Sequence, residues 1–517
     1  MIKRILDNRI FILYVCPFII GILGVFSFAP FNLTLINFII IPSLFLLLSF
    51  VNKKSKSKYR KKPYLRNLFF VGYLFGFGFF LSNTYWISYS LTFDENLKVL
   101  IPFSVALIPL GLGLFFGFTS LIVGPFIKNN YSSFFLFCLA FSLTDYLRGK
   151  IFSGFPWNLW SYSWSWMTEI IQILNPIGLY CFNSISIAFF CSPVVFFFKN
   201  KSKFFVFSSF LLIFFSFYIY GSYKINNNQK ILESSKESVN VKIISPNFDM
   251  RYIQSDEEIK STIEKIVRYS EPNPDKETIF ILPEGIFAGV YLEDLKKFSN
   301  NFRDNFSKNH LIIFGANTSD NLSSKFYNSL VVINNDFKIL YKYDKKKLVP
   351  FGEFLPFDDI FEKFGLKKIT YGYGSFSEGG KQKNFEFRNL SILPLICYEI
   401  IFPNLVQNSN QKTNMIINIS EDAWFGNSIG PHHHFTKAIF RSIESNTYLI
   451  RSANKGISAF INNNGNVVKL IKSNEAGNIE LEVPLLEAYS KNRNDLIFFI
   501  LLITYTIIFL IMRKINE

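Results

Sequence analysis

Long apolar blocks constrain the fold of this chain more than any other feature of its sequence. Half of the 517 residues are hydrophobic, and these residues gather in blocks. Because a helix needs about 20 mostly apolar residues to cross a bilayer, the blocks predict an α-helical integral membrane protein with eight transmembrane helices. The third, fourth and sixth blocks exceed one crossing, which predicts tilt, re-entrant pieces or interfacial turns there. The predicted spans cover residues 10–28, 33–50, 68–90, 100–127, 131–148, 172–198, 203–221 and 495–512.

Clusters of Lys and Arg predict how these spans are oriented. Loops rich in positive charge are retained on the cytoplasmic side of a membrane. With eight spans, every basic cluster falls on one side, so both termini are expected in the cytoplasm and residues 223–494 on the outer side. The clusters are Lys3 with Arg4 and Arg9, the run from Lys53 to Arg66, Lys128, Lys199 with Lys201 and Lys203, and Arg513 with Lys514.

The charge distribution separates the membrane part from a nearly neutral outer domain. Residues 223–494 hold 34 Lys and Arg against 31 Asp and Glu, whereas the whole chain carries +16. The excess of positive charge is therefore a topology signal, and no basic stripe in the outer domain points to nucleic acid. We expect a membrane domain at residues 1–222, an outer domain at residues 223–494 and a final helix at residues 495–517.

The outer domain alternates strand-like and helix-like segments after a polar linker predicted at residues 224–240. Such alternation predicts a layered α/β domain with a largely covered sheet. The candidate strands are residues 241–244, 278–282, 311–316, 329–334, 338–343, 390–396, 415–419, 448–452 and 457–461, and the candidate helices are 256–269, 292–307 and 433–445.

Cys397 is the only cysteine in the predicted outer domain. In an oxidising compartment a lone thiol has no disulfide partner within its own domain, so it is either incidental or chemically active. It ends the apolar, strand-like run at residues 390–396 and stands two residues before Glu399. That is a common way to present a nucleophile.

Two charged residues at other predicted strand ends can complete a catalytic site. Glu284 follows the run 278–282 and Lys345 follows the run 338–343, and strand ends are where sites assemble in α/β domains. A Cys nucleophile needs a base for its proton and a cation for the oxyanion formed on an acyl carbonyl, and Glu284 and Lys345 supply both. On residue type alone, the run Lys345–Lys347 is equally typical of solvated surface.

Taken in chain order, the segments 282–284, 343–353 and 397–399 resemble the Glu-Lys-Cys triad of the nitrilase superfamily. The apolipoprotein N-acyltransferase branch of that superfamily is also similar in carrying several membrane spans before the catalytic domain and one after it. The resemblance implies a nitrilase-like α-β-β-α sandwich inserted between the seventh and eighth spans, on the periplasmic side of a bacterial inner membrane. It extends to residues 145–149, 154–157, 422–426 and 430–431.

The resemblance implies a role for each matching residue. Glu284 becomes the general base, Lys345 the oxyanion stabiliser and Cys397 the nucleophile, with an adjacent ammonium favouring the thiolate. Two glutamates are implied as supporting residues, and two aromatic residues as the wall of the acyl or lipid pocket, for which ordinary packing is an equal alternative. The supporting residues are Glu353 and Glu399, and the aromatic residues are Tyr398 and Trp424.

The sequence departs from the family pattern at three places. Glu421 stands where the family usually has Asn, Asp145 stands where Glu is commoner, and residues 245–249 match the first-strand motif only loosely. These departures concern substrate contacts more than the triad.

The resemblance implies an acyl transfer with two lipid substrates. A phospholipid donates an acyl chain to Cys397 as a thioester, and the α-amino group of an S-diacylglyceryl cysteine at the start of a lipoprotein accepts it. No cofactor, metal or nucleic acid is expected, and one site per chain predicts a monomer in the bilayer. The alternatives are a membrane-anchored amidase or nitrilase-like hydrolase, and a transporter or scaffold whose outer domain only binds.

The tract His432–His434 has two further interpretations. Three consecutive imidazoles cannot all face one ion, and no matching carboxylate or Cys spacing accompanies them, so a metal site is not predicted. His434 is an alternative base for Cys397.

Overall fold

The computed structural model describes residues 8–58, 63–199, 201–235, 237–320, 325–356, 375–407, 412–486, 488–489 and 494–516. It divides into two compact units. The helical unit comprises residues 1–224, 428–436 and 493–517, and the sheet unit comprises residues 225–427 and 437–492. The basic residues 3–4 and 60–62, used above to predict orientation, lie outside the described residues.

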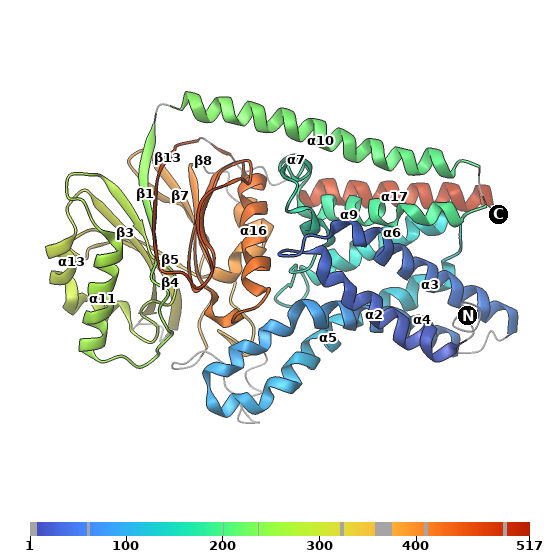
Figure 1. Ribbon diagram of the computed structural model, residues 1–517, viewed down its shortest axis with the longest axis horizontal. Helices are drawn as coiled ribbons and strands as arrows, with labels where there is room; N and C mark the ends of the chain where they lie inside the picture. Colours follow the sequence, from blue (N-terminus) through green and yellow to red (C-terminus); the bar gives the residue numbers. More distant parts are fainter. Residues whose placement is uncertain are drawn as a thin grey trace. The chain divides into compact units, whose positions relative to one another are not determined.

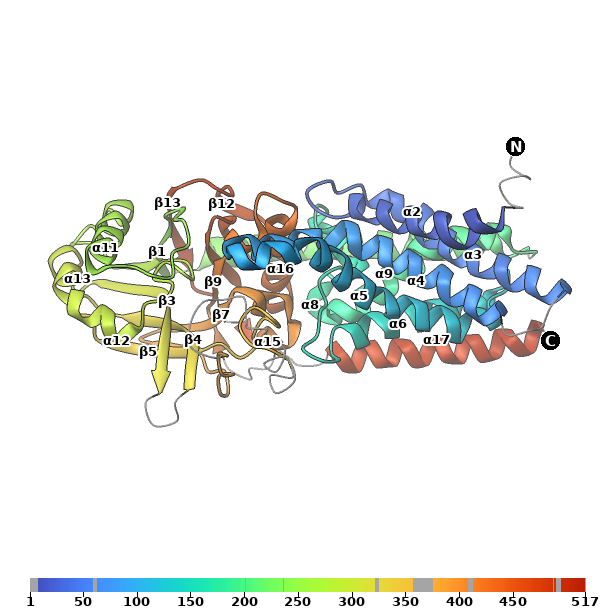
Figure 2. The same ribbon diagram turned by 90° about the horizontal axis from the view of Figure 1, so that it is seen from below.

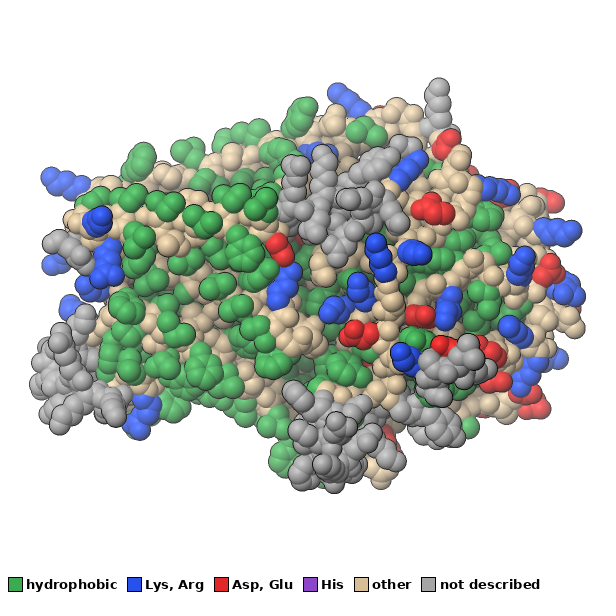
Figure 3. All heavy atoms as spheres, turned by 180° about the vertical axis from the view of Figure 1, so that it is seen from behind, with side chains coloured by type: hydrophobic (Ala, Val, Ile, Leu, Met, Phe, Trp, Pro, Cys, Tyr) green, Lys and Arg blue, Asp and Glu red, His purple; other side chains and the backbone are tan. Residues whose placement is uncertain are grey.

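Apolar helices make up the helical unit (Figure 1). On the face that Figure 3 shows, apolar side chains cover much of the helical unit, whereas charged side chains are frequent on the sheet unit. Its main elements are η1 (Phe11–Val15), α2 (Cys16–Leu23), η2 (Gly24–Ser27), α3 (Asn37–Lys58), α4 (Pro63–Thr84), η4 (Tyr85–Phe93), η5 (Glu95–Leu100), α5 (Ile101–Val123), α6 (Tyr131–Arg148), α7 (Thr168–Ile171), α8 (Leu174–Ile177), α9 (Leu179–Cys191), η8 (Ser192–Phe197), α10 (Lys203–Ser234) and α17 (Asn494–Asn516).

Six helices among the described residues are long and apolar enough to cross a membrane. They are Thr34–Lys53, Tyr64–Phe93, Glu95–Phe126, Leu179–Phe197, Lys203–Ser234 and Asp495–Ile515. The first predicted span corresponds to a shorter apolar helix, Phe11–Ser27. The fifth corresponds to α6, where polar residues such as Asp145 and Arg148 lower the hydropathy. The prediction of a helical membrane protein is confirmed, and the number eight stays a prediction.

Two predicted boundaries in the helical part are wrong. The sixth block does not form one helix over 172–198, because Gly178 with φ of +75° separates the short α8 from α9. Within this block α8 forms a short separate helix before α9, and the interfacial turns expected here stay a prediction. Residues 224–234, predicted as part of a linker, continue α10 as a helix. They stay helical because Asn228 donates to Asn464 Oδ1 at 2.6 Å and Leu232 packs against the core of the sheet unit.

A buried ion pair at the end of α6 holds the segment that follows it. Asp145 Oδ1 lies 3.0 Å from Arg148 Nη2, and Asn183 Nδ2 donates to Asp145 Oδ2 at 2.9 Å. Arg148 also donates to the main-chain carbonyls of Phe155 and Asn158. Because a buried charge must be paired and hydrogen-bonded, this pair fixes the path of residues 149–158. The observation explains why the motif resemblance included both segments.

Two six-stranded mixed sheets form the centre of the sheet unit. The first has the order β13-β1-β2-β3-β4-β5, and the second β12-β11-β10-β9-β7-β6. The neighbours β1, β2 and β3 run parallel, as do β7, β9 and β10. The first sheet contains β1 (Ser238–Ser245), β2 (Thr278–Ile281), β3 (His310–Asp320), β4 (Lys325–Ile333), β5 (Ile339–Asp344) and β13 (Gly477–Pro484). The second contains β6 (Phe385–Phe387), β7 (Leu390–Ile396), β9 (Met415–Glu421), β10 (Tyr448–Asn454), β11 (Ser458–Ile461) and β12 (Val467–Ile471).

Apolar side chains from both sheets pack face to face, and helices cover the outer faces. Val241, Ile281 and Ile313 of the first sheet belong to one core with Ile396 and Ile417 of the second. A separate core joins the other face of the first sheet to three helices (Figures 1 and 2). These helices are α11 (Asp256–Ser270), α12 (Leu292–Leu295) and α13 (Ser299–Asn305), and α16 (Gly430–Ser445) lies along the second sheet. The predicted sandwich is thus confirmed.

All nine predicted strands of the outer domain are present, with small shifts at their ends. The predicted helix 292–307 is divided into α12, the turn η9 (Lys296–Phe298) and α13. The sequence analysis missed β6, β12 and β13, as well as the pairing of β14 (Ala488–Tyr489) with β8 (Lys412–Thr413). These strands are short or carry several polar residues, so their apolar pattern is weak.

The close approach of α4 and α5 gives a test of the helical unit. A Cβ atom at Gly72 would lie 2.4 Å from the Phe116 carbonyl oxygen and 2.1 Å from Ser120 Oγ, whereas one at Gly111 would meet nothing within 4 Å. We expect Gly72→Ala to destabilise the protein by about 1–3 kcal/mol through overpacking. The matched control, Gly111→Ala, should leave the midpoint of thermal unfolding in detergent unchanged. Equal midpoints for the two variants would contradict this packing.

Candidate active site

Cys397 lies at the carboxyl end of β7 and opens the short turn η11 (Cys397–Ile401). Its φ of +46° is in the left-handed region, which is unfavourable for a residue with a Cβ atom and persists only where the surroundings hold it. The residue is 7% exposed. The fold therefore imposes an unusual backbone conformation at the nucleophile predicted from the sequence.

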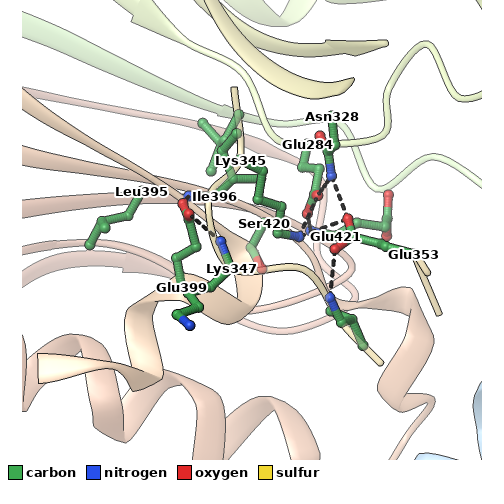
Figure 4. Close-up of polar contacts among 12 residues, drawn as sticks. Glu284, Asn328, Lys345, Lys347, Glu353, Leu395, Ile396, Glu399, Ser420 and Glu421 are labelled. Atoms are coloured by element: carbon green, nitrogen blue, oxygen red, sulfur yellow. Dashed lines mark hydrogen bonds and ion pairs between the residues drawn. The ribbon is translucent and has the colours of Figure 1, made fainter. Parts of the chain in front are cut away.

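Glu284 and Lys345 also follow strand ends, and the structure brings them together. Lys345 Nζ lies 3.5 Å from Glu284 Oε1 and 2.9 Å from Glu353 Oε1 (Figure 4). All three side chains are buried. Asn328 Nδ2 donates to Glu284 Oε1 and to Glu353 Oε1, each at 2.7 Å. One cation and one amide thus hold two carboxylates in a fixed arrangement.

Glu399 connects the strand that ends at Cys397 with the strand that ends at Lys345. Its Oε2 accepts the Ile396 N–H at 2.8 Å. Its Oε1 accepts the Lys346 N–H at 2.7 Å, the Lys347 N–H at 3.1 Å and the Tyr343 hydroxyl at 2.8 Å. The carboxylate is fully buried, and its four donors come from both sides of the site. Burial raises the pKa of Glu399, and these donors oppose that rise.

The surroundings of Cys397 favour the protonated thiol over the thiolate. Burial raises the pKa of Cys397 well above its ordinary value, and the nearby Glu284 carboxylate raises it further. Lys345 lowers the pKa of Cys397, in the predicted direction, but does not outweigh burial. Burial works to lower the pKa of Lys345, whereas Glu284 and Glu353 raise it above the ordinary lysine value, so Lys345 is a permanent cation here. The thiol therefore needs a base before it can attack.

The two aromatic residues predicted to line a pocket lie in different surroundings. Tyr398 is buried, with its ring centroid 5.2 Å from that of Phe402. Trp424 is half-buried in the turn η12 (Asp422–Phe425), and its ring centroid lies 6.5 Å from that of Tyr252. A substrate-binding role for Tyr398 and Trp424 stays a prediction.

A buried polar group beside the predicted nucleophile was not expected from the sequence. Asp422 accepts from Arg451 Nη2 at 2.8 and 3.0 Å and from the Ser420 hydroxyl at 2.7 Å. The parallel register that pairs Ile396 with Ile419 places Ser420 beside Cys397. Asn328 was missed as well. A polar residue inside an otherwise apolar strand was the only signal for Asn328 and Arg451.

The tract His432–His434 lies at the start of α16 and belongs to the helical unit. The Trp157 indole donates to His433 Nδ1 at 3.4 Å, and the His434 ring stacks on Trp157 with centroids 5.5 Å apart. Within the described ranges, no group of three or more His, Cys, Asp and Glu side chains is arranged to hold a metal ion. The two histidines thus pack against the segment that Arg148 fixes.

Comparison with known proteins agrees with both halves of this description. Residues 20–192 match the model of the apolipoprotein N-acyltransferase N-terminal domain, and residues 279–491 match the carbon-nitrogen hydrolase model. The apolipoprotein N-acyltransferase of Rickettsia typhi is 32% identical over 476 residues, which cover 90% of this chain and 91% of the relative. The chain belongs to the apolipoprotein N-acyltransferase family.

More distant members of the family and one solved structure align as well. The apolipoprotein N-acyltransferase of Allorhizobium ampelinum is 29% identical over 429 residues, covering 80% of this chain and 79% of that relative. Among solved structures, Saccharomyces cerevisiae Nit3, a member of branch 10 of the nitrilase superfamily, aligns with 48% of this chain and 91% of its own. That alignment has a TM-score of 0.36 and 17% identity. The two family models and the relative from Rickettsia typhi show that the chain is an acyltransferase of the nitrilase superfamily.

The electrostatics of Cys397 give a pH-dependent prediction. Because the Lys345 ammonium lowers the pKa of the thiol, Lys345→Met should raise that pKa further and reduce the thiolate present at a given pH. Each unit of added pKa should slow alkylation of Cys397 by iodoacetamide about tenfold on the acidic limb. Peptide mass spectrometry across a pH series measures the rate at Cys397. A Lys346→Met control should keep the native profile, and an unchanged profile for Lys345→Met would contradict the assigned electrostatics.

The four donors to Glu399 give a second prediction. Glu399→Gln keeps the shape but turns one oxygen into a donor that faces main-chain N–H groups. The mispaired contact should cost about 1–3 kcal/mol of stability and misplace the segments on both sides of the site. Chemical unfolding and Cys397 alkylation measure these two effects. The exposed Glu378→Gln is the matched control, and a Glu399→Gln protein as stable as this control would show that the prediction is wrong.

Proposed function

We propose that the enzyme transfers an acyl chain from a phospholipid to the α-amino group of the N-terminal S-diacylglyceryl cysteine of a lipoprotein. The observation that carries this proposal is the joining of a buried Glu284, Lys345 and Cys397 group with the apolipoprotein N-acyltransferase N-terminal domain in one chain. Both substrates are lipids, which accounts for a catalytic domain joined to apolar helices. A soluble amide would require no such anchor.

The first half of the proposed reaction forms an acyl-enzyme. Glu284 accepts the Cys397 proton as Sγ attacks the ester carbonyl carbon of the phospholipid. Lys345 stabilises the oxyanion of the tetrahedral intermediate, where fixed positive charge is most effective because little water competes. When the intermediate collapses, the ester C–O bond breaks, and the lysophospholipid oxygen takes the proton from Glu284. A thioester on Cys397 remains.

The second half uses the same groups in reverse. The lipoprotein α-amine, in its neutral form, attacks the thioester carbonyl and forms a C–N bond, while Lys345 again stabilises the oxyanion. Glu284 accepts the amine proton, the C–S bond breaks, and that proton returns to the departing thiolate. Glu353 and Asn328 keep Lys345 and Glu284 in place throughout, and Glu399 holds the backbone beside Cys397. Tyr398 and Trp424 are proposed to contact the acyl chain or lipid.

The topology belongs to the same proposal. The helices Phe11–Ser27 and α6, together with the six longer helices, make eight crossings of a bacterial inner membrane. Both termini then lie in the cytoplasm, and residues 223–494 form a periplasmic domain between the membrane domain 1–222 and the last helix 495–517. The distribution of Lys and Arg supports this orientation. One complete group of catalytic residues per chain supports a monomer.

The test is mass spectrometry of detergent-purified protein incubated with a defined phospholipid. We expect an acyl chain on the peptide containing Cys397, absent from Cys397→Ala and discharged when a diacylated lipopeptide is added. Cys16→Ala is the matched control and should acylate normally. Discharge by water alone at the same rate would favour a hydrolase, and the lack of any adduct on folded protein would favour a binding protein or transporter.

A further inference from the structure

Glu421, the last residue of β9, contacts the proposed base through its main chain. Its N–H donates to Glu284 Oε2 at 3.0 Å, the oxygen opposite to the one that Asn328 holds. Its side chain is buried, and Oε1 accepts the Ala423 N–H at 3.0 Å at the start of η12. Glu421 therefore shapes the turn that carries Trp424 and also holds Glu284.

Asn454 determines whether the side chain at position 421 must donate or accept hydrogen bonds. The Asn454 Oδ1 accepts the Phe248 N–H at 2.8 Å, and Nδ2 donates to the Phe248 carbonyl at 2.9 Å. With its amide oriented by the main chain, Asn454 presents only N–H toward Glu421, where Nδ2 lies 2.9 Å from Oε2 and 3.2 Å from Oε1. Position 421 must therefore present acceptors on both oxygens, which a carboxylate does and an amide does not.

The loop at residues 246–255, which follows β1, contains Phe248 and so lies on the other side of Asn454 from Glu421. Tyr252 in this loop packs near Trp424, and burial together with the negative charges of Glu421 and Glu284 raises the pKa of its hydroxyl. The position of Glu421 also explains why a glycine follows Glu284. Gly285 has a φ of +76°, and a Cβ atom added there would lie 2.7 Å from Glu421 Oε2. The loop, the base and the aromatic turn thus meet at one residue, since the Glu421 main chain contacts Glu284 and its carboxylate accepts from Asn454 and from the Ala423 N–H.

We propose that Glu421 is a positioning residue that couples Glu284 to the loop 246–255, so that the base takes its working position when the loop is seated through Asn454. This inference rests on the proposed function, because it takes Glu284 to be the base. It assigns a role to Glu421, one of the positions at which the sequence departs from the family pattern. It also links the aromatic residues Tyr252 and Trp424 to the position of Glu284.

The experiment measures alkylation of Cys397 by iodoacetamide, which needs the base but no lipid. Glu421→Gln preserves volume but sets a donor against the Asn454 amide, and we expect alkylation about tenfold slower than in the native chain. Asn454→Asp alone should slow it similarly. The double variant Glu421→Gln with Asn454→Asp restores a donor facing an acceptor between these two positions but still lacks the donor to the Phe248 carbonyl, so we expect it to recover part of the native rate and to react faster than either single variant. Glu264→Gln, on the exposed face of α11, is the matched control at the native rate.

The outcomes separate positioning from a general loss of structure. A native alkylation rate in Glu421→Gln, or a double variant slower than both single variants, overturns the proposal. Should Glu421→Gln fail to fold, Asn454→Ser removes the donor and leaves the Glu421 main-chain contact with Glu284. Slow alkylation in a folded Asn454→Ser protein supports the coupling, and a native rate overturns it. If the native chain forms no acyl-enzyme while Glu421→Gln still alkylates slowly, the proposed function fails and the coupling stands.

Discussion

The arrangement of the active site depends on the buried carboxylate of Glu399. β5 belongs to the first sheet and β7 to the second, so Lys345 and Cys397 stand at the ends of strands that share no ladder. Glu399 accepts N–H groups from the residue before Cys397 and from the two residues after Lys345. A buried charge is very costly unless it is fully hydrogen-bonded, so these donors must converge for the domain to fold. Because Glu399 must accept hydrogen bonds from both segments, it holds the backbone next to Cys397 close to the backbone next to Lys345.

A second constraint is the charge balance around Lys345. Its ammonium faces two carboxylates, and Asn328 donates to both of them. Glu353 makes the shorter contact with the ammonium, at 2.9 Å against 3.5 Å for Glu284, so Glu284 has the weaker of the two ion pairs. The two glutamates therefore have different roles in the proposed mechanism. Glu353 neutralises the Lys345 ammonium, and Glu284 remains able to accept a proton.

Much of the fold was predictable from local sequence, whereas the polar interactions that cross the sheets were not. Continuous apolar runs such as 278–282 and 390–396 predicted the strands, because a strand covered on both faces buries successive residues. The family resemblance placed Glu284, Lys345 and Cys397. Asn328, Asp422 and Arg451 were missed because their partners are distant in the chain and leave no local pattern. The helical extension of α10 past residue 224 was missed for the same reason, since its contacts come from Asn464 and the sheet core.

The protonation state of Cys397 has a consequence for the lifetime of the enzyme. Oxidation to sulfenic and higher acids begins with the thiolate and with solvent access. A buried thiol whose pKa is raised well above the ordinary value offers little of either. The predicted nucleophile is therefore held in a form that oxidants attack slowly, and in the proposed mechanism it becomes reactive only while a bound substrate and Glu284 share its proton. Protection from damage and dependence on a base are two results of the same burial.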